Sequence, residues 1–158
     1  MKIALFTETF LPKVDGIVTR LTKTVQHLVA AGDEVLVFCP EGAPSSYCGA
    51  QVVGVPAMPL PLYPELKLAL PRPAVAEALE RFEPDLVHVV NPAVLGLGGI
   101  WLAKTKGYPL VASYHTHLPK YLEHYGMGML EPLLWELLKA AHNQAVLNLC
   151  TSTAMVQE

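Results

Sequence analysis

Short apolar runs alternate along this chain with longer segments in which apolar residues recur every three or four positions. The short runs are apolar at nearly every position, which is typical of strands in a parallel sheet that is covered on both faces. The longer segments predict helices with one buried side. Strands that alternate with helices favour an α/β fold, in which a Rossmann-like parallel sheet carries helices on both faces.

The same pattern sets the bounds of each expected element. Strands are expected at residues 2–7, 34–39, 51–56, 86–90, 110–113 and 145–151. Helices are expected at residues 17–29, 73–82, 92–106 and 130–141. Loops are expected at residues 40–50 and 114–128, and at residues 56–73, where six prolines exclude a continuous helix.

The length of 158 residues suits a single layered domain. The chain ends about one turn into what reads as a further helix, with Ser152 or Thr153 as its cap. A domain rarely ends at such a point. We therefore expect residues 1–158 to be the amino-terminal domain of a longer protein that has been cut at Glu158.

Composition narrows the class of protein. The chain is 52% hydrophobic and 16% charged, with a mean hydropathy of +0.35, so we expect other parts of a protein to cover some of its apolar surface. No apolar run reaches the ~20 residues that a membrane-spanning helix needs. The short apolar start meets Glu8 too soon for a secretory signal, and we expect a cytoplasmic location.

Charge and cysteine content exclude two further classes. The net charge is −3 and no cluster of Lys or Arg is present, which argues against nucleic acid as a partner. Cys39, Cys48 and Cys150 are odd in number and widely spaced, so neither a disulfide framework nor a zinc knuckle is expected.

The candidate site begins where the first strand passes into the first helix. Residues 8–16 form a loop whose single glycine, Gly16, lies directly before the helix. The first N–H groups of a helix lack partners and carry partial positive charge, and a glycine lets an anion approach the backbone. This junction predicts a phosphate site. Ligands of open parallel sheets lie at the carboxyl ends of the strands, so residues 91–92 and 114–117 are expected to border the same crevice.

A dinucleotide site fits this sequence poorly. It requires Gly-x-Gly-x-x-Gly directly after the first strand, and the loop there holds one glycine. Gly96, Gly98 and Gly99 lie inside an expected helix, where small residues more often permit close packing against the sheet.

Histidines raise the question of a metal. His115 and His117 alternate and would face the same side of an extended segment, with His124 nearby. No carboxylate stands at a spacing that would complete such a site, and we expect no metal. We expect structural roles for His117, His124 and His142. His115, at a strand end that faces the glycine loop, is the candidate functional histidine.

Three motifs together resemble a known family. They are residues 6–17 (FTETFLPKVDGI), 82–88 (FEPDLVH) and 113–117 (SYHTH). They resemble the amino-terminal half of the retaining glycosyltransferases of family four, which have two Rossmann-like domains in the GT-B arrangement. Within that family, residues 61–73 and 91–97 are most similar to the sulfolipid synthases of cyanobacteria, although related mannosyl- and glucosyltransferases share much of the pattern.

The resemblance implies an activity and roles for particular residues. It implies transfer of sulfoquinovose from UDP-sulfoquinovose to diacylglycerol with retention and without a cofactor. Gly16 would lie against the donor diphosphate, with Asp15 and Arg20 on either side, and His115 would contact the donor sugar as the catalytic residue. The family's remaining donor-binding residues lie in a carboxy-terminal half, so the chain alone is expected to be inactive.

A diacylglycerol acceptor implies peripheral contact with the cytoplasmic or thylakoid membrane. The residues expected to contact the acceptor or the membrane are Tyr121, Tyr125, Met127, Met129 and Trp135. The leucines of the helix at residues 130–141 are expected to pack in the core instead. Two alternatives stay open: a family-four transferase for another hexose and lipid, and a non-catalytic Rossmann-like module that binds a membrane or a partner.

Overall fold

The computed structural model describes residues 1–60, 63–115 and 128–153. Its centre is a seven-stranded sheet in the order β3-β4-β2-β1-β7-β8-β9. All neighbouring strands run parallel except β3 and β4, which are antiparallel. The strands are β1 (Lys2–Thr7), β2 (Glu34–Pro40), β3 (Ser46–Tyr47), β4 (Ala50–Val55), β7 (Leu86–Val90), β8 (Leu110–Tyr114) and β9 (Leu147–Cys150).

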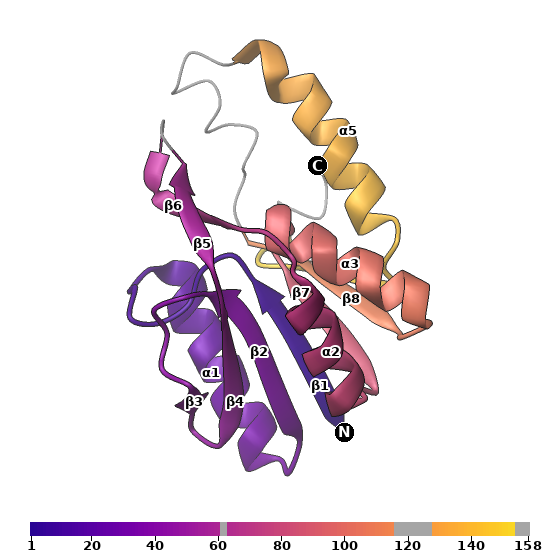
Figure 1. Cartoon of the computed structure of the whole chain (residues 1–158). Coiled ribbons are helices and arrows are strands. Elements are labelled where there is room, and N and C mark those ends of the chain that lie inside the picture. Colours follow the sequence, from indigo (N-terminus) through magenta and orange to yellow (C-terminus); the bar gives the residue numbers. More distant parts are fainter. Residues whose placement is uncertain (61–62, 116–127, 154–158) are drawn as a thin grey trace.

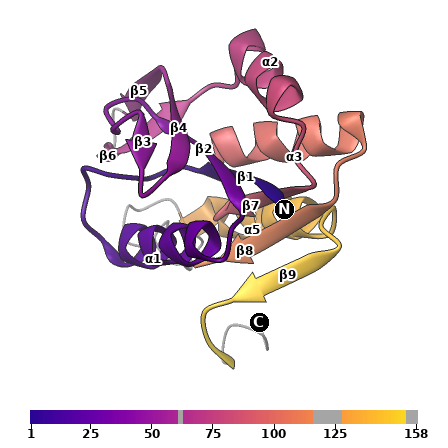
Figure 2. The same ribbon diagram turned by 90° about the horizontal axis from the view of Figure 1, so that it is seen from below.

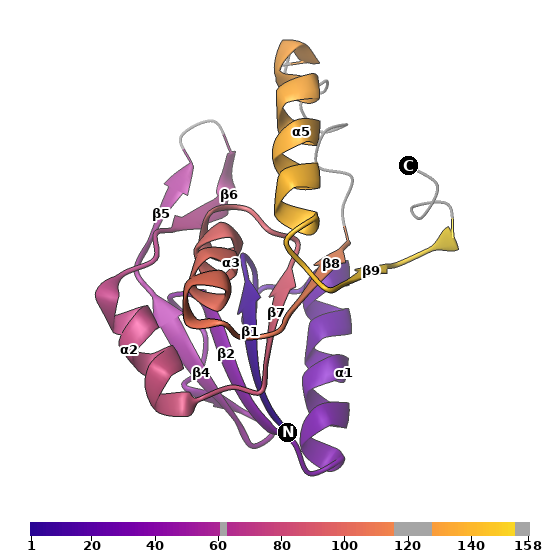
Figure 3. The ribbon, with the colours of Figure 1, turned by 90° about the vertical axis from the view of Figure 1, so that its right-hand side faces the viewer.

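Helices cover both faces of the sheet, as Figures 1 and 2 show. The helix α1 (Gly16–Ala30) lies on one face, and α2 (Pro73–Phe82) and α3 (Val94–Lys106) lie on the other. The helix α5 (Glu131–His142) follows a short 3₁₀ helix, η1 (Gly128–Leu130), and extends beyond the sheet (Figure 3). The expected Rossmann-like α/β fold is confirmed.

Alternate residues of each central strand enter two separate cores. In β1, Ala4 and Phe6 point into the core beneath α2 and α3, whereas Ile3 and Leu5 point into the core beneath α1. The Phe6 ring stacks on the Phe38 ring, with centroids 4.6 Å apart. Both sides of a strand are therefore buried, which explains why the strands read as continuous apolar runs.

Glycines let α3 approach the sheet closely, as expected. A Cβ atom added at Gly99 would lie 2.6 Å from the Phe6 ring, and one added at Gly96 would lie 2.9 Å from Val89. A Cβ atom at Gly98 would collide with Pro71. These glycines serve packing between α3 and its neighbours.

The loop predicted for residues 56–73 is wrong. Strands β5 (Ala57–Leu60) and β6 (Tyr63–Ala69) form a separate antiparallel sheet. Proline cannot donate a ladder hydrogen bond, but each strand of a two-stranded sheet has a free edge where that loss is harmless. The loop predicted for residues 40–50 is also wrong in part, because β3 lies there and pairs with β4.

The leucines of α5 were predicted to be core, and most of them are not. Leu130, Leu133 and Leu137 are 49%, 59% and 53% exposed, while Leu138 and Ala141 are buried. Because α5 runs past the sheet, only Leu138 and Ala141 of this helix are buried among the described residues. Within the residues that the structure describes, no helix is both long and apolar enough to cross a membrane.

Candidate functional site

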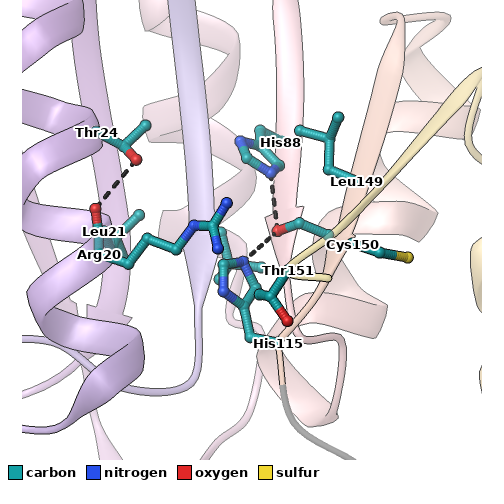
Figure 4. Close-up of a pocket in the computed structure, with 10 residues that line it drawn as sticks. Arg20, Leu21, Thr24, His88, His115, Leu149, Cys150 and Thr151 are labelled. Atoms are coloured by element: carbon teal, nitrogen blue, oxygen red, sulfur yellow. Dashed lines mark hydrogen bonds between the residues drawn. The ribbon is translucent and has the colours of Figure 1, made fainter. Parts of the chain in front are cut away.

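A pocket lies between α1 and the carboxyl-terminal parts of β7, β8 and β9, with a volume of ≈ 110 Å³ (Figure 4). Its lining residues are Arg20, Leu21, Thr24, His88, Val90, Ser113, His115, Leu149, Cys150 and Thr151. The sequence predicted a crevice at this end of the sheet, and the structure brings two of the predicted residues, Arg20 and His115, together in it. The pocket is smaller than the few hundred cubic ångströms of a typical ligand site, so it suits part of a ligand.

Two histidines in the pocket meet at one serine hydroxyl. The Nε2 atom of His88 lies 3.0 Å from Ser113 Oγ, and the Nε2 atom of His115 lies 2.9 Å from the same oxygen. Figure 4 shows both contacts, with the Arg20 side chain reaching from α1 toward His115. The result is a continuous polar chain from the middle of β7 to the end of β8.

Burial favours the neutral form of both imidazoles. Burial lowers the pKa of His88 to about 4, and the neighbouring His115 adds to the effect. Burial also lowers the pKa of His115, with a further contribution from the positive charge of Arg20. The described lining contains no carboxylate, so Arg20 gives the pocket a positive character that favours an anion.

The start of α1 lies one turn before Arg20. Gly16 is the first helical residue, and a Cβ atom added there would meet no other atom within 4 Å. Gly16 and Arg20 are four residues apart and therefore share one side of the helix. The Asp15 carboxylate accepts a hydrogen bond from the Val18 N–H at 2.8 Å and pairs with Lys13 at 3.3 Å. Asp15 thus caps α1 and occupies one of the amides at the helix start that were expected to bind an anion.

Asn91 joins the ends of β7 and β8. Its backbone N–H donates to the Ser113 carbonyl at 2.8 Å, and its Oδ1 accepts from the His115 N–H at 3.4 Å. Its φ of 54° lies in the left-handed region, which asparagine tolerates better than most residues. Asn91 therefore holds the backbone of His115 in place from the neighbouring strand.

Sequence reasoning missed one half-buried and one buried polar residue in this part of the sheet. One is His88; the feature that could have revealed it is a histidine inside the otherwise apolar strand β7. The other is Glu8, which directly follows β1 and is 8% exposed. Its Oε1 accepts hydrogen bonds from the N–H groups of Ala93 at 3.1 Å and Gly96 at 2.8 Å, at the start of α3. Burial raises the pKa of Glu8, and these backbone bonds oppose the rise.

The predicted acceptor and membrane residues lie away from the pocket or outside the described residues. Met129 is 94% exposed at η1, and Trp135 is partly buried, with its ring centroid 6.4 Å from that of Tyr114. Trp135 lines a second, more open cavity of ≈ 200 Å³. Tyr121, Tyr125 and Met127 lie outside the described residues.

Of the three histidines expected to have structural roles, the structure describes one, His142. His142 Nδ1 lies 2.7 Å from Asn148 Oδ1, which fits its predicted structural role. His117 and His124 lie outside the described residues. Within residues 1–60, 63–115 and 128–153, no group of three or more His, Cys, Asp or Glu side chains is arranged to hold a metal ion.

The fold and the pocket define a Rossmann-like domain with an anion-favouring site at the carboxyl ends of its strands. The model of Glycosyltransferase Family 4 matches residues 14–158. The chain belongs to glycosyltransferase family 4.

Curated relatives align over nearly the whole chain. It is 35% identical to the GDP-mannose-dependent alpha-mannosyltransferase of Mycolicibacterium smegmatis, over 99% of this chain and 44% of that enzyme. It is also 35% identical to the sulfoquinovosyl transferase SQD2 of Arabidopsis thaliana, over 98% of this chain and 31% of that enzyme. The alpha-monoglucosyldiacylglycerol synthase of Streptococcus pneumoniae is 29% identical, over 82% of this chain and 30% of that enzyme. The chain thus spans less than half the length of these relatives.

Proposed function

We propose that this protein is a retaining hexosyltransferase that transfers sulfoquinovose from UDP-sulfoquinovose to diacylglycerol, and that this chain is its acceptor-side, amino-terminal domain. The observation that carries the proposal is the pocket that Arg20 and His115 share, which has no carboxylate in its described lining. Membership of glycosyltransferase family 4 supports sugar transfer. The similarity to a sulfoquinovosyl transferase and to a glucosyldiacylglycerol synthase supports a lipid acceptor.

In the proposed reaction, the bond between the anomeric carbon and the diphosphate breaks while the acceptor oxygen bonds to that carbon on the same face of the sugar. The acceptor's hydroxyl proton passes to the departing diphosphate oxygen. No cofactor takes part. The protein's contribution is to position the two substrates and to stabilise the negative charge of the leaving group.

The residues of the site fit these tasks. The Arg20 guanidinium supplies positive charge next to the first turn of α1, where the bare backbone of Gly16 leaves room for a diphosphate. Asp15 keeps that turn capped. The neutral His115 imidazole is the catalytic residue, which forms a hydrogen bond to the donor sugar beside the reacting carbon.

The acceptor requires contact with a bilayer from the cytoplasmic face of the cytoplasmic or thylakoid membrane. Met129, Leu133 and Leu137 place apolar surface on η1 and α5, beyond the edge of the sheet. Such a surface can enter the boundary between headgroups and acyl chains without crossing it. We assign Trp135 and the preceding Tyr121, Tyr125 and Met127 to the same contact.

A second candidate is transfer of mannose from GDP-mannose to a lipid. The mycobacterial mannosyltransferase is as similar to this chain as the plant sulfoquinovosyl transferase, at 35% identity each. The two candidates share the pocket and the fold and differ in the donor.

The test is a donor panel for the polypeptide expressed from its complete reading frame. UDP-sulfoquinovose, UDP-glucose and GDP-mannose are each offered with vesicles that contain diacylglycerol, and the lipid product is measured. We expect product from the sulfonated donor. Product from only one of the other donors would reject the sulfolipid assignment, and product from none would favour a binding module. His115→Ala is expected to lose transfer, whereas His27→Ala, at an exposed position near the end of α1, is the matched control.

A further inference from the structure

A polar pair, the buried Ser113 and the half-buried His88, lies inside two otherwise apolar strands next to His115. His88 interrupts β7 (LVHVV), and Ser113 interrupts β8 (LVASY), where it is 2% exposed. Burying a hydroxyl or an imidazole is unfavourable unless each group is hydrogen-bonded. Here the Ser113 Oγ takes both contacts, at 3.0 Å to His88 Nε2 and 2.9 Å to His115 Nε2.

The chemistry of a hydroxyl couples the two rings. Ser113 has one proton to donate and lone pairs with which to accept. Between two neutral imidazoles it can donate to only one Nε2 atom, so at least one of the two rings must carry its proton on Nε2 and donate it to Ser113 Oγ. Which ring nitrogen of His115 carries the proton then depends on His88, a residue on a different strand. The engagement of His115 Nε2 also leaves its Nδ1 as the ring nitrogen available to a ligand.

Among the described residues that line the pocket, one, Arg20, carries a charge. Arg20 approaches from α1, while β9 contributes Leu149 and Cys150 and no carboxylate lines the described pocket. A carboxylate is the usual partner that orients a working imidazole. In this pocket the hydroxyl and the second imidazole stand where that carboxylate would be, and they add no negative charge against an incoming anion.

We propose that Ser113 and His88 are positioning residues for His115: the Ser113 hydroxyl, itself anchored by His88, fixes the rotamer and the proton-bearing nitrogen of the His115 ring. This inference rests on the proposed role of His115 in sugar transfer. It assigns no substrate contact to Ser113 or His88. Both residues act through His115, so their loss affects the chemical step more than donor binding.

The kinetic test uses the polypeptide expressed from its complete reading frame. Ser113→Ala and His88→Asn are expected to lower kcat by about 10- to 100-fold, since a misplaced reacting group costs rate steeply, with the donor KM changed by less than about threefold. A glutamine side chain reaches about as far as the histidine Nε2, so His88→Gln is expected to recover most of kcat. The exposed Ser46→Ala and His27→Gln are the matched controls.

A double-mutant cycle separates positioning from packing. If His88 acts through Ser113, His88→Asn lowers kcat little further in the Ser113→Ala background, because the link is already broken. Additive losses would overturn the proposal. Thermal unfolding of each variant shows whether it is folded, and if Ser113→Ala does not fold, the comparison of His88→Asn with His88→Gln makes the same test.

An independent readout is the ring ¹⁵N spectrum of the histidine-labelled protein, with His115 assigned by its loss in His115→Ala. Ser113→Ala is expected to change the tautomer populations of His115, and Ser46→Ala is not. Unchanged His115 signals together with an unchanged kcat would overturn the positioning role. Changed signals in a protein that transfers no sugar from any donor would instead count against the proposed function.

Discussion

The Oε1 atom of Glu8 lies 2.8 Å from the backbone nitrogen of Gly96, so a side chain at the end of β1 caps the first turn of α3. The helix has no side-chain cap of its own, since Ala93 stands at that position. Glu8, which directly follows β1, supplies the missing acceptor although it lies 88 positions before Gly96 in the sequence.

Glu8→Ala is expected to destabilise the fold by about 1–3 kcal/mol, because the buried Gly96 amide and the half-buried Ala93 amide lose their acceptor. Glu8→Gln keeps a neutral oxygen at the same reach and is expected to cost less. The free energy of unfolding, measured with urea at pH 7, checks both. The matched control is Glu77→Ala at an exposed position on α2. Equal stability of Glu8→Ala and Glu77→Ala would contradict the capping role.

Stability should fall in acid because of His88. Its pKa is about 4 in the folded protein and about 6.5 when unfolded, so the unfolded state takes up a proton first as the pH falls. The stability that the neutral ring contributes is complete above about pH 6.5 and is lost toward pH 4. His115 shifts in the same direction. Glu8 shifts oppositely: its raised pKa gives stability at acid pH that is lost as the pH rises.

His88→Gln removes the titrating group and so isolates the contribution of His88 to the pH dependence of the free energy of unfolding. Between pH 7 and pH 4.5, wild type is expected to lose about 2 kcal/mol more than this variant. Urea midpoints at the two pH values measure the difference. His27→Gln, at an exposed position, is the control. If the urea midpoints of His88→Gln and wild type change equally between the two pH values, the prediction is wrong.

Arg20→Ala is expected to weaken donor binding by about 10- to 100-fold, the loss typical of a hydrogen bond to a charged group. Arg20→Lys keeps the charge but lacks the planar guanidinium group, so its donor affinity should lie between those of wild type and Arg20→Ala. Isothermal titration with the nucleotide sugar measures the affinity. Lys23→Ala, an exposed cation on the same helix, is the control. Equal donor affinities for Arg20→Ala and Lys23→Ala would remove Arg20 from the site.

Gly16→Val is expected to abolish transfer and to leave the fold intact. The position for a Cβ atom is open, so a side chain fits there but fills the space assigned to the diphosphate. Gly16→Ala, with a single methyl group, should retain intermediate activity. Donor affinity and the melting temperature are measured for both. Unchanged donor affinity in the valine variant would place the diphosphate elsewhere.

The exposed leucines of α5 give a prediction for membranes. Leu133→Ser combined with Leu137→Ser is expected to reduce binding to diacylglycerol-containing vesicles by about 10-fold or more. Each substitution removes the favourable free energy of transferring a leucine side chain into the apolar layer. Flotation of the complete polypeptide with vesicles measures this. The matched control is Leu147→Ser, a leucine of similar exposure on β9. An equal effect of the control would argue against α5 as the contact.

The sequence could predict the central strands and most helices because the signals lie close together along the chain. Continuous apolar runs such as β1 and β2 have both faces buried, and the glycines of α3 mark a close approach to the sheet. It could not predict β5 and β6, since prolines normally exclude strands and only the free edges of a two-stranded sheet tolerate them. It also misjudged Leu133 and Leu137, because the pattern gives a helix an apolar side without showing what covers it.

For the site, the order of elements placed His115 and Arg20 near one end of the sheet, since parallel strands end at a common edge. The sequence alone therefore determined the fold class and the end of the sheet at which the pocket lies. The tertiary structure alone decided that Ser113 joins His88 to His115, that Glu8 caps α3, and that Asp15 is engaged at its own helix. Hydrogen bonds between remote residues depend on distances of a few tenths of an ångström, and those distances exist only once the strands have paired and the helices have packed.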